Sequence, residues 1–265
     1  MALYPYNIPE GWIFVPARKK TLSGLDRLIN ADVIIFDLED SLKEDEKEEG
    51  LRLIGELSLP DDGRSFFVRL NSERLYHELD HLRDTGIDGF MIPKFEGIQV
   101  LDEYDGLLKG RRVAALIETP AGVARLPEYA GDKRINAFAF GAEDFGAALG
   151  IDVNERAVLY ARSRLVLYAA MHKKLSVDMM SKEVKDRETF NKDLINTLEL
   201  GFNGKLLIHP MQLEMLCRMK SSVPKEKIRD IIDRFEKDPS GALMIDGRLY
   251  ERMHIDRLKK LVKGE

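Results

Sequence analysis

Residues 112–144 read RVAALIETPAGVARLPEYAGDKRINAFAFGAED and contain the unit that decides the fold. An apolar, β-rich run at 112–119 is followed by a helix-like segment and then by a second apolar run at 136–144. Two strands separated by a helix pair as parallel neighbours through a right-handed crossover. This stretch therefore predicts a strand–helix–strand unit of an α/β protein.

The same alternation extends along the chain in both directions. Six further short apolar runs are each followed by a helix-length segment; they lie at 11–16, 32–40, 65–71, 89–94, 175–178 and 205–210. Eight strands that alternate strictly with helices close most simply into a barrel. We therefore predict an α/β fold, a (β/α)8 TIM barrel, which typically contains about 250 residues and can be shorter.

The barrel pattern ends before the chain does. We assign residues 1–220 to a catalytic barrel domain and residues 221–265 to a C-terminal helical extension or lid. The extension contains the helical pattern VPKEKIRDIIDRFEKD, a glycine-containing turn in DPSGALMIDGR, and a charged helix from about Glu251. No glycine- or serine-rich linker interrupts the chain.

Composition argues against several classes of partner. The chain has 41 basic and 46 acidic side chains, a net charge of −5, and no block of basic residues that would follow a phosphate backbone. No stretch approaches the roughly 20 apolar residues of a membrane span, and the start, MALYPYNIPEGW, does not read as a targeting segment. The one cysteine of the chain, Cys217, can form no internal disulfide. We expect a cytoplasmic protein that binds neither nucleic acid nor membrane.

Polar residues recur at the carboxyl ends of the predicted strands, where a barrel builds its active site. They are Arg18, Lys19, Asp37, Glu39, Asp40, Arg69, Asn71, Lys94, Glu118, Glu143, Asp144, Asp178 and His209. Side chains alternate along a strand, so Asp37 and Glu39 share a face while Asp40 points elsewhere. The same spacing puts Arg69 and Asn71 on one face. The pattern predicts one pocket that gathers acids and cations.

Two of these carboxylates have the chemistry of a metal site. Glu118 and Asp144 end successive predicted strands, and Mg²⁺ usually binds one or two carboxylates and keeps positions open for substrate oxygens. The guanidinium of Arg69 would then grip a substrate carboxylate in bidentate fashion, with Glu39 as an acid, base or orienting group. Each carboxylate taken alone could instead cap the following helix. The set as a whole favours a small oxyacid as ligand.

One short motif suggests a different chemistry. Residues 77–81 read HELDH, which matches the H-E-x-x-H pattern of zinc proteases. The leucines of this helix place His77 and His81 on its solvent side, and no obvious third ligand follows. We therefore reject a metallopeptidase and expect the polar side chains of this motif to face the solvent.

The assembled motifs resemble the citrate lyase β-subunit family, within the HpcH/HpaI aldolase superfamily of acyl-CoA lyases. The resemblance covers nearly the whole chain. It rests on FVP at 14–16, DLEDS at 37–41, VRLN at 68–71, IPKFEG at 92–97, LIETPAGV at 116–123, FGAEDFGAALG at 140–150 and GFNGKLLIHPMQ at 201–212.

This resemblance implies a carbon–carbon lyase of the oxo-acid-lyase type, with Mg²⁺ on Glu118 and Asp144. Its substrate would be a small oxyacid or its CoA thioester, such as citryl-, malyl- or citramalyl-CoA. The implied catalytic residues are Arg69, Glu39, Asp37 and Glu251, and the implied substrate or CoA contacts are Arg18, Lys19, Lys94 and Arg69. The resemblance also implies a homo-oligomer, either a trimer or a hexamer.

Two departures from the family leave alternatives open. Lys19 stands where the family has an arginine, and Glu251 stands where it has an aspartate of a C-terminal lid. These changes motivate a non-catalytic barrel that binds an oxyacid. A 2-oxo acid aldolase of the pyruvate or oxaloacetate type is the other alternative, including one that forms an imine on Lys94.

Overall fold

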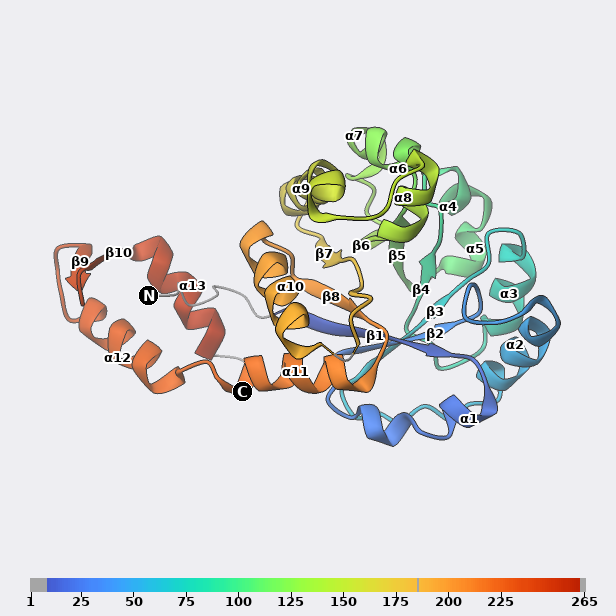
Figure 1. Ribbon diagram of the computed structural model, residues 1–265, viewed down its shortest axis with the longest axis horizontal. Helices are drawn as coiled ribbons and strands as arrows, with labels where there is room; N and C mark the ends of the chain where they lie inside the picture. Colours follow the sequence, from blue (N-terminus) through green and yellow to red (C-terminus); the bar gives the residue numbers. More distant parts are fainter. Residues whose placement is uncertain (1–8, 185, 263–265) are drawn as a thin grey trace. The chain divides into compact units, whose positions relative to one another are not determined.

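The computed structural model describes residues 9–184 and 186–262. Eight parallel strands form a closed barrel in the order β1 to β8, and β8 pairs with β1 (Figure 1). The strands are β1 (Glu10–Pro16), β2 (Val33–Asp37), β3 (Ser65–Arg69), β4 (Gly89–Ile92), β5 (Arg112–Ile117), β6 (Ile135–Phe140), β7 (Leu175–Asp178) and β8 (Gly204–Leu207). The fold is thus the predicted (β/α)8 barrel.

Helical segments connect each strand to the next around the outside of the barrel (Figure 1). In chain order they are α1 (Lys19–Leu22), the 3-10 turns η1 (Leu25–Leu28) and η2 (Glu44–Glu46), α2 (Lys47–Gly55), α3 (Leu75–Leu82), α4 (Gln99–Glu103), α5 (Asp105–Leu108), α6 (Pro120–Ala124), α7 (Leu126–Tyr129), α8 (Ala142–Leu149), α9 (Glu155–Met171), α10 (Arg187–Leu200) and α11 (Pro210–Ser221).

Side-chain alternation along the strands decides what fills the barrel. One set of buried residues packs together in the interior: Trp12, Val33, Ile35, Phe67, Met91, Ala114, Leu116, Ala137, Ala139, Val177 and Leu206. The residues between them on each strand, such as Ile34 and Phe66, are buried too and face the helices. The interior is therefore a packed core and not a channel.

The interior face continues into charged residues where the strands end. Asp37 and Arg69 close β2 and β3 and are paired in register, two positions beyond the core residues Ile35 and Phe67. Glu118 follows β5, two positions beyond the core residue Leu116. The periodicity that packs the core thus also delivers these three side chains to the carboxyl end of the barrel.

One predicted strand is too long. We predict a strand over 136–144, but β6 ends at Phe140, and Glu143 and Asp144 lie in the first turn of α8. Gly141 separates the two elements and acts as the N-cap residue of α8. Asp144 therefore follows the strand end on a helix, where a carboxylate in the first turn also interacts favourably with the helix dipole.

The described chain divides into two compact units, Pro9–Met215 and the segment from Leu216 onward. The second unit contains α12 (Lys225–Glu236), an antiparallel hairpin of β9 (Ala242–Ile245) and β10 (Arg248–Glu251), and α13 (Arg252–Val262). We predict the helices but not the hairpin. Its turn residues Asp246 and Gly247 have φ angles of 50° and 79°, as a two-residue hairpin turn requires. The predicted division after residue 220 and the lid role stay predictions.

No helix in the described part of the chain is long and apolar enough to cross a membrane. The first eight residues, where we expect no targeting segment, lie outside the described residues. Cys217 is in no disulfide and is partly buried.

Candidate active site

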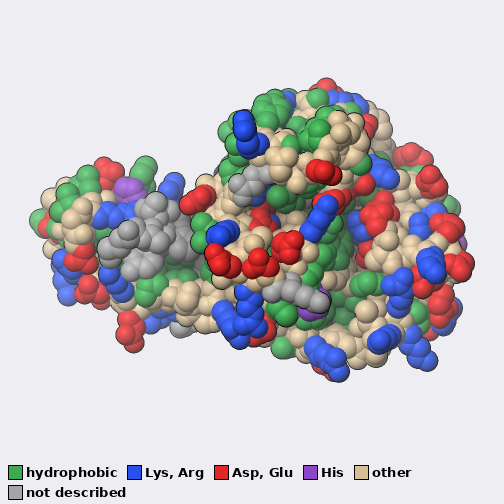
Figure 2. Space-filling view, in the orientation of Figure 1, with side chains coloured by type: hydrophobic (Ala, Val, Ile, Leu, Met, Phe, Trp, Pro, Cys, Tyr) green, Lys and Arg blue, Asp and Glu red, His purple; other side chains and the backbone are tan. Residues whose placement is uncertain are grey.

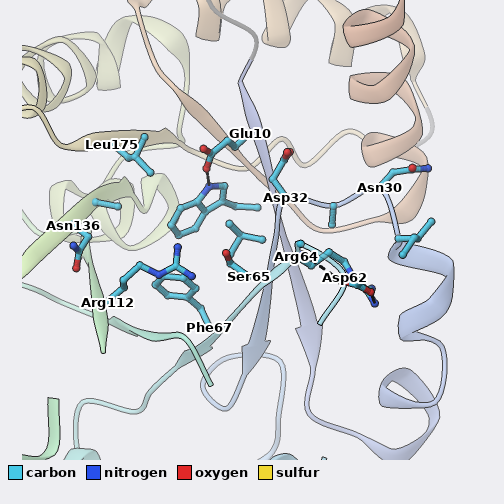
Figure 3. Close-up of a pocket in the computed structure, with 16 residues that line it drawn as sticks. Glu10, Asn30, Asp32, Asp62, Arg64, Ser65, Phe67, Arg112, Asn136 and Leu175 are labelled. Carbon is cyan, nitrogen blue, oxygen red and sulfur yellow. Dashed lines mark hydrogen bonds and ion pairs between the residues drawn. The ribbon is translucent and has the colours of Figure 1, made fainter. Parts of the chain in front are cut away.

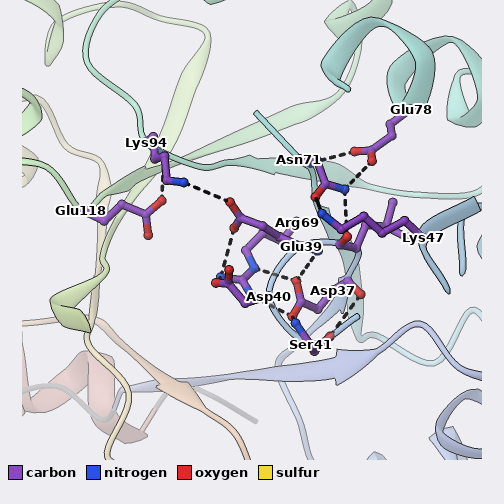
Figure 4. Close-up of polar contacts among 11 residues, drawn as sticks. Asp37, Glu39, Asp40, Ser41, Lys47, Arg69, Asn71, Glu78, Lys94 and Glu118 are labelled. Carbon is purple, nitrogen blue, oxygen red and sulfur yellow. Dashed lines mark hydrogen bonds and ion pairs between the residues drawn. The ribbon is translucent and has the colours of Figure 1, made fainter. Parts of the chain in front are cut away.

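An ion pair between two adjacent strands forms the centre of the site. Arg69 donates from Nε and Nη2 to the two carboxylate oxygens of Asp37, at 2.7 Å each (Figure 4). Asp37 also accepts hydrogen bonds from the backbone N–H groups of Glu39 and Ser41. Burial alone would raise the pKa of Asp37, but Arg69 and these donors hold it below its usual value. Asp37 is therefore a fixed anion that orients Arg69.

The bidentate edge of Arg69 is occupied within the protein. The sequence suggests that Arg69 binds a substrate carboxylate through two nitrogens, but in the structure these nitrogens bind the carboxylate of Asp37. The remaining nitrogen, Nη1, lies 3.3 Å from Glu39 Oε2 and 3.0 Å from Asp40 Oδ2. The prediction that Asp40 points elsewhere is wrong, because β2 ends at Asp37 and strand alternation stops there. Nη1 is the part of Arg69 that faces the other acids of the site.

Glu39 is buried beside Arg69, and one of its oxygens is unsatisfied. Within the described chain, Oε2 is buried without a hydrogen-bond partner, although Arg69 Nη1 is near. Lys94 Nζ lies 4.0 Å from Oε1. Burial raises the pKa of Glu39 to about 7 against the opposing charge of Arg69. A carboxyl group with such a pKa can take up or release a proton near neutral pH.

Glu118 is buried at the end of β5 and is held by a neighbouring loop. Its Oε1 accepts a 2.7 Å hydrogen bond from the backbone N–H of Lys94, whose φ of 48° is uncommon for a residue other than glycine. A Cβ at Gly141 would come within 2.5 Å of Glu118 Oε2, so glycine leaves room for the carboxylate. Thr119, and not Glu118, caps α6. Helix capping therefore does not explain Glu118.

Asp144 shares a small cavity with Glu118. The cavity, of about 60 Å³, is also lined by Phe14, Arg69 and Met180. Asp144 makes no hydrogen bond or ion pair with the described residues, and it helps burial to raise the pKa of Glu118 to about 8. Two carboxylates that repel each other across a cavity fit a hard cation, whose charge would remove the repulsion.

The donor set distinguishes between metals. In the described part of the chain, no group of three or more His, Cys, Asp or Glu side chains gathers in a way that could hold a metal ion. Structural zinc needs four protein ligands and catalytic zinc usually three. Mg²⁺ accepts one or two carboxylates and completes its shell with water and substrate oxygens. The pair of carboxylates therefore fits Mg²⁺ better than zinc.

A second cavity, of about 320 Å³, lies beside the first and shares Asp40 with it. Glu39, Lys47, Asn71 and Lys94 are among the side chains that line it. On the face drawn in Figure 2, the barrel unit is hollowed, with hydrophobic side chains inside the hollow and charged side chains beside it. The site thus combines a narrow carboxylate pocket with a wider, polar cavity.

Two predicted site residues of the barrel unit, Arg18 and Lys19, do not join this cluster. Arg18 directs Nε and Nη2 to the carboxylate of Glu46, at 3.0 and 2.8 Å. Lys19 is exposed on α1, and neither residue lines either cavity. Glu251 ends β10 in the second compact unit. Their roles at the site stay predictions.

Asp178 and His209, which we predict at the same rim, are not part of it. Asp178 faces the helices, because its neighbour on β7 fills the barrel interior. There Arg162 donates to both of its oxygens, at 2.9 and 2.6 Å, while Thr197 and Lys205 contact Oδ2. All four of these side chains are buried. His209 is exposed just before α11.

The HELDH helix holds a residue that sequence reasoning missed. His77 is exposed and lies 3.2 Å from Glu48, and His81 is exposed too. Both histidines thus face the solvent, as predicted. Glu78 is instead only 2% exposed and bonds to Asn71. The spacing of the leucines indicates this burial, because Glu78 lies three positions after Leu75 and four before Leu82, on the apolar face of α3.

A larger cavity, of about 450 Å³, lies at the opposite end of the barrel (Figure 3). Residues from the starts of strands line it, including Glu10, Val33, Ser65, Arg112, Asn136 and Leu175. Its cations already have partners, since Arg64 pairs with Asp62 and Arg112 stacks on Phe67 at 5.1 Å. None of the predicted site residues lines it. Barrel enzymes place catalysis at the carboxyl end, so we place the site there.

Comparison with known proteins finds similar sequences along most of the chain. A family model described as HpcH/HpaI aldolase/citrate lyase matches residues 11–210. The chain is 30% identical over 266 residues to a (3S)-malyl-CoA thioesterase of Cereibacter sphaeroides (strain KD131 / KCTC 12085), over 96% of this chain and 93% of the relative. It is 28% identical to citrate lyase subunit beta of Leuconostoc mesenteroides subsp. cremoris, over 95% of this chain and 91% of that one.

Two solved structures are similar along much of the chain. The citrate lyase beta subunit of M. tuberculosis, complexed with oxaloacetate and magnesium, superposes with a TM-score of 0.71 at 26% identity, over 82% of this chain and 99% of that one. Protein CitE from Mycobacterium tuberculosis, in complex with magnesium, acetoacetate and coenzyme A, gives a TM-score of 0.81 at 23% identity, over 97% of this chain and 98% of that one. The second likeness supports the fold.

Proposed function

Because this chain belongs to the HpcH/HpaI aldolase/citrate lyase family, we propose that it is a Mg²⁺-dependent carbon–carbon lyase. Its substrate is a 3-hydroxyacyl-CoA thioester such as citryl-, malyl- or citramalyl-CoA, which it cleaves to an acyl-CoA and a 2-oxo acid or forms in the reverse direction. The observation that carries this proposal is the Glu118 and Asp144 pair in one cavity beside Arg69.

Glu118 and Asp144 would hold the Mg²⁺ ion. The raised pKa of Glu118 and the lack of a partner for Asp144 among the described residues are what a site built for a cation shows. The similar M. tuberculosis structure with oxaloacetate and magnesium supports this choice of metal. When bound, the ion supplies a Lewis acid that polarises a substrate oxygen.

We assign proton transfer to Glu39. In cleavage it takes the proton of the 3-hydroxyl group while the bond between C2 and C3 of the acyl chain breaks. The electrons of that bond pass into the enolate of the departing thioester, and a proton returned to C2 completes the acyl-CoA. Arg69 Nη1 stabilises the negative charge of this enolate, while Asp37 holds the guanidinium in place.

The family resemblance supplies further contacts. Arg18, Lys19 and Lys94 contact the substrate or the CoA, and Glu251 acts from the C-terminal unit as a lid residue. Only Lys94 of these lines the 320 Å³ cavity. We also propose a homo-oligomer, a trimer or a hexamer, in the cytoplasm. Light scattering on the purified protein and cell fractionation test these two points.

The test of the lyase is release of the 2-oxo acid from citryl-, malyl- and citramalyl-CoA, measured with and without Mg²⁺. We expect cleavage of at least one of these thioesters that stops when Mg²⁺ is chelated and in the Asp144→Ala variant. Cleavage by the variant at the wild-type rate would contradict the metal assignment. No cleavage of any of the three would contradict the substrate class.

Similarity to a malyl-CoA thioesterase gives a second candidate, hydrolysis of the same kind of thioester. In that reaction water attacks the thioester carbonyl, and the products are the free hydroxy acid and CoA. Product analysis separates the two. Acetyl-CoA or propionyl-CoA with a 2-oxo acid indicates the lyase, and free CoA with malate, citrate or citramalate indicates the hydrolase.

The remaining alternatives are less well supported by the site. An imine-forming aldolase needs a desolvated lysine, whereas the Lys94 side chain is 53% exposed and lies 4.0 Å from Glu39. Borohydride treatment with pyruvate or oxaloacetate would trap a covalent adduct if this alternative were right. A barrel that only binds an oxyacid is excluded once turnover of any thioester is measured.

A further inference from the structure

Glu78, the second residue of HELDH, is buried where a carboxylate is costly. It is 2% exposed on α3, and burial raises its pKa to about 7. The charged groups that face it are Arg74 and Lys47, and neither forms an ion pair with it among the described residues. A leucine would pack as well at this position of the helix. A buried acid without a cation partner therefore needs an explanation from its hydrogen bonds.

Both oxygens of Glu78 bind one residue. Oε2 accepts a hydrogen bond of 2.8 Å from the backbone N–H of Asn71, and Oε1 accepts one of 2.5 Å from Asn71 Nδ2 (Figure 4). Asn71 lies in the loop after β3, two residues beyond Arg69. The carboxylate thus fixes both the main chain and the side chain of Asn71.

Asn71 in turn forms hydrogen bonds with two other parts of the site. Its Nδ2 also donates to the Leu38 carbonyl at 2.8 Å, and Leu38 lies between Asp37 and Glu39. Its Oδ1 accepts a 2.6 Å hydrogen bond from Lys47 Nζ. Lys47, Asn71 and Glu39 line the same 320 Å³ cavity. Figure 4 shows the chain of contacts from Glu78 through Asn71 to the loop that carries Glu39.

We propose that Glu78 is a positioning residue, which acts through Asn71 to hold the Glu39 loop and the Lys47 ammonium group in place for the reaction. The inference rests on the proposed lyase function, because it assigns Glu39 to proton transfer. Glu78 itself does not touch the cavity. Its loss should therefore slow the chemical step more than it weakens binding at the carboxylate pair, which lies after β5 and on α8.

The test compares Glu78→Gln with Asp80→Asn, a matched change at an exposed carboxylate of the same helix that pairs with Arg83. Glutamine keeps the size but offers Asn71 an NH2 group in place of one acceptor. We expect kcat to fall roughly 10- to 100-fold in Glu78→Gln, the range for residues that orient site groups. KM should stay within about threefold, and Asp80→Asn should match the wild type within about twofold.

A double-mutant cycle with Asn71→Ala shows whether Glu78 acts through Asn71. We expect the double variant to be no slower than Asn71→Ala alone. Multiplied losses, a change in KM alone, or an equal loss in Asp80→Asn would overturn the proposal. Glu78→Asp, which keeps the charge and shortens the side chain, replaces Glu78→Gln in the cycle if the latter does not fold.

The proposed function and this inference can fail separately. If the wild type cleaves no thioester, the lyase assignment fails, and the same variants are then compared by urea unfolding. If the shifts of the unfolding midpoint in the Glu78 and Asn71 variants do not add up in the double variant, the two residues are coupled. If the shifts add up, they are not coupled. If the wild type is active and kcat is unchanged in Glu78→Gln, only the positioning role fails.

Discussion

Two clusters of polar side chains lie on opposite faces of the barrel sheet, and each contains an acid from the carboxyl end of a strand. The inner cluster (Asp37, Glu39, Arg69 and Glu118) continues the barrel interior, and the outer cluster (Arg162, Asp178, Thr197 and Lys205) faces the helices. In the inner cluster, burial raises the pKa of Glu39 and of Glu118. In the outer cluster, the pKa of Asp178 is lowered, because its cations outweigh the burial that would raise it.

The direction of these pKa shifts separates Asp178, which is paired within the fold, from Glu39 and Glu118, which are incompletely paired. An acid with a lowered pKa already has its counter-charge within the protein, so the ion pair belongs to the fold. An acid with a raised pKa is incompletely paired and is stabilised by a cation or a substrate that binds there. One residue of register along a strand decides which cluster a side chain joins.

The largest effect is expected for the metal pair of the inner side. Glu118→Gln keeps the shape of the side chain but removes the charge, and a Lewis acid contributes several kcal/mol to the barrier. We expect turnover to fall by about 1,000-fold, or ~4 kcal/mol. The matched control is Glu143→Gln, because Glu143 lines the same cavity but pairs with Lys182. A comparable loss in this control would show that the pair was wrongly chosen.

The outer cluster should respond in stability and not in turnover. Asp178→Ala leaves Arg162 buried with no carboxylate partner, and breaking a buried pair costs about 3 kcal/mol or more. Lys205 keeps its ion pair with Asp193, at 2.9 Å, which limits the loss. Urea unfolding measures the change, and the kcat of the folded variant should stay within about threefold. A stable but inactive variant would place Asp178 in the site after all.

The inner cluster should instead cost stability at neutral pH. The pKa of Glu39 is raised from a usual 4.5 to about 7, so its protonated form favours the folded state below about pH 4.5. That contribution is lost as the pH rises through 7, where a buried charge forms. Glu39→Gln should therefore raise the unfolding free energy by about 2 kcal/mol at pH 8 relative to the wild type.

The control for Glu39→Gln is the same comparison at pH 4.5, where the stability gain should disappear. Turnover should be lost at both pH values, because glutamine cannot transfer the proton. A variant that is no more stable than the wild type at pH 8 would mean that Glu39 is already ionised at little cost in the folded protein.

The sequence was sufficient for the fold and for the composition of the inner cluster. Strands that are buried on both faces leave a strong apolar signal, and polar residues at their ends stand out against it. Asp37, Arg69 and Glu118 were accessible for this reason. Asp178 was misassigned because the apolar run LSVD does not reveal which of its residues faces the interior.

Other features depended on contacts that a linear pattern does not contain. Asp40 reaches Arg69 because the chain turns after Asp37. Asp37 binds the Nε and Nη2 side of Arg69 because the register of β2 against β3 places the two residues side by side. The hairpin of the second unit was predictable from the Asp246–Gly247 dipeptide, a strong turn signal that the surrounding helical pattern obscured.

The smallest effect distinguishes Lys94, which lies beside the inner cluster, from Lys205 of the outer cluster. Lys94 is half-exposed and reaches Glu39 only at 4.0 Å, whereas Lys205 is fully buried between two carboxylates. What fixes Glu118 is the backbone N–H of Lys94, and an alanine keeps that group. Lys94→Ala should therefore change the unfolding free energy by about 0.5 kcal/mol or less. Turnover should fall by less than about tenfold, the factor that ~1.4 kcal/mol of barrier gives. Complete loss of turnover with an intact fold would contradict this, because it would make the ammonium group, and not the main chain, the contribution of Lys94 to the reaction.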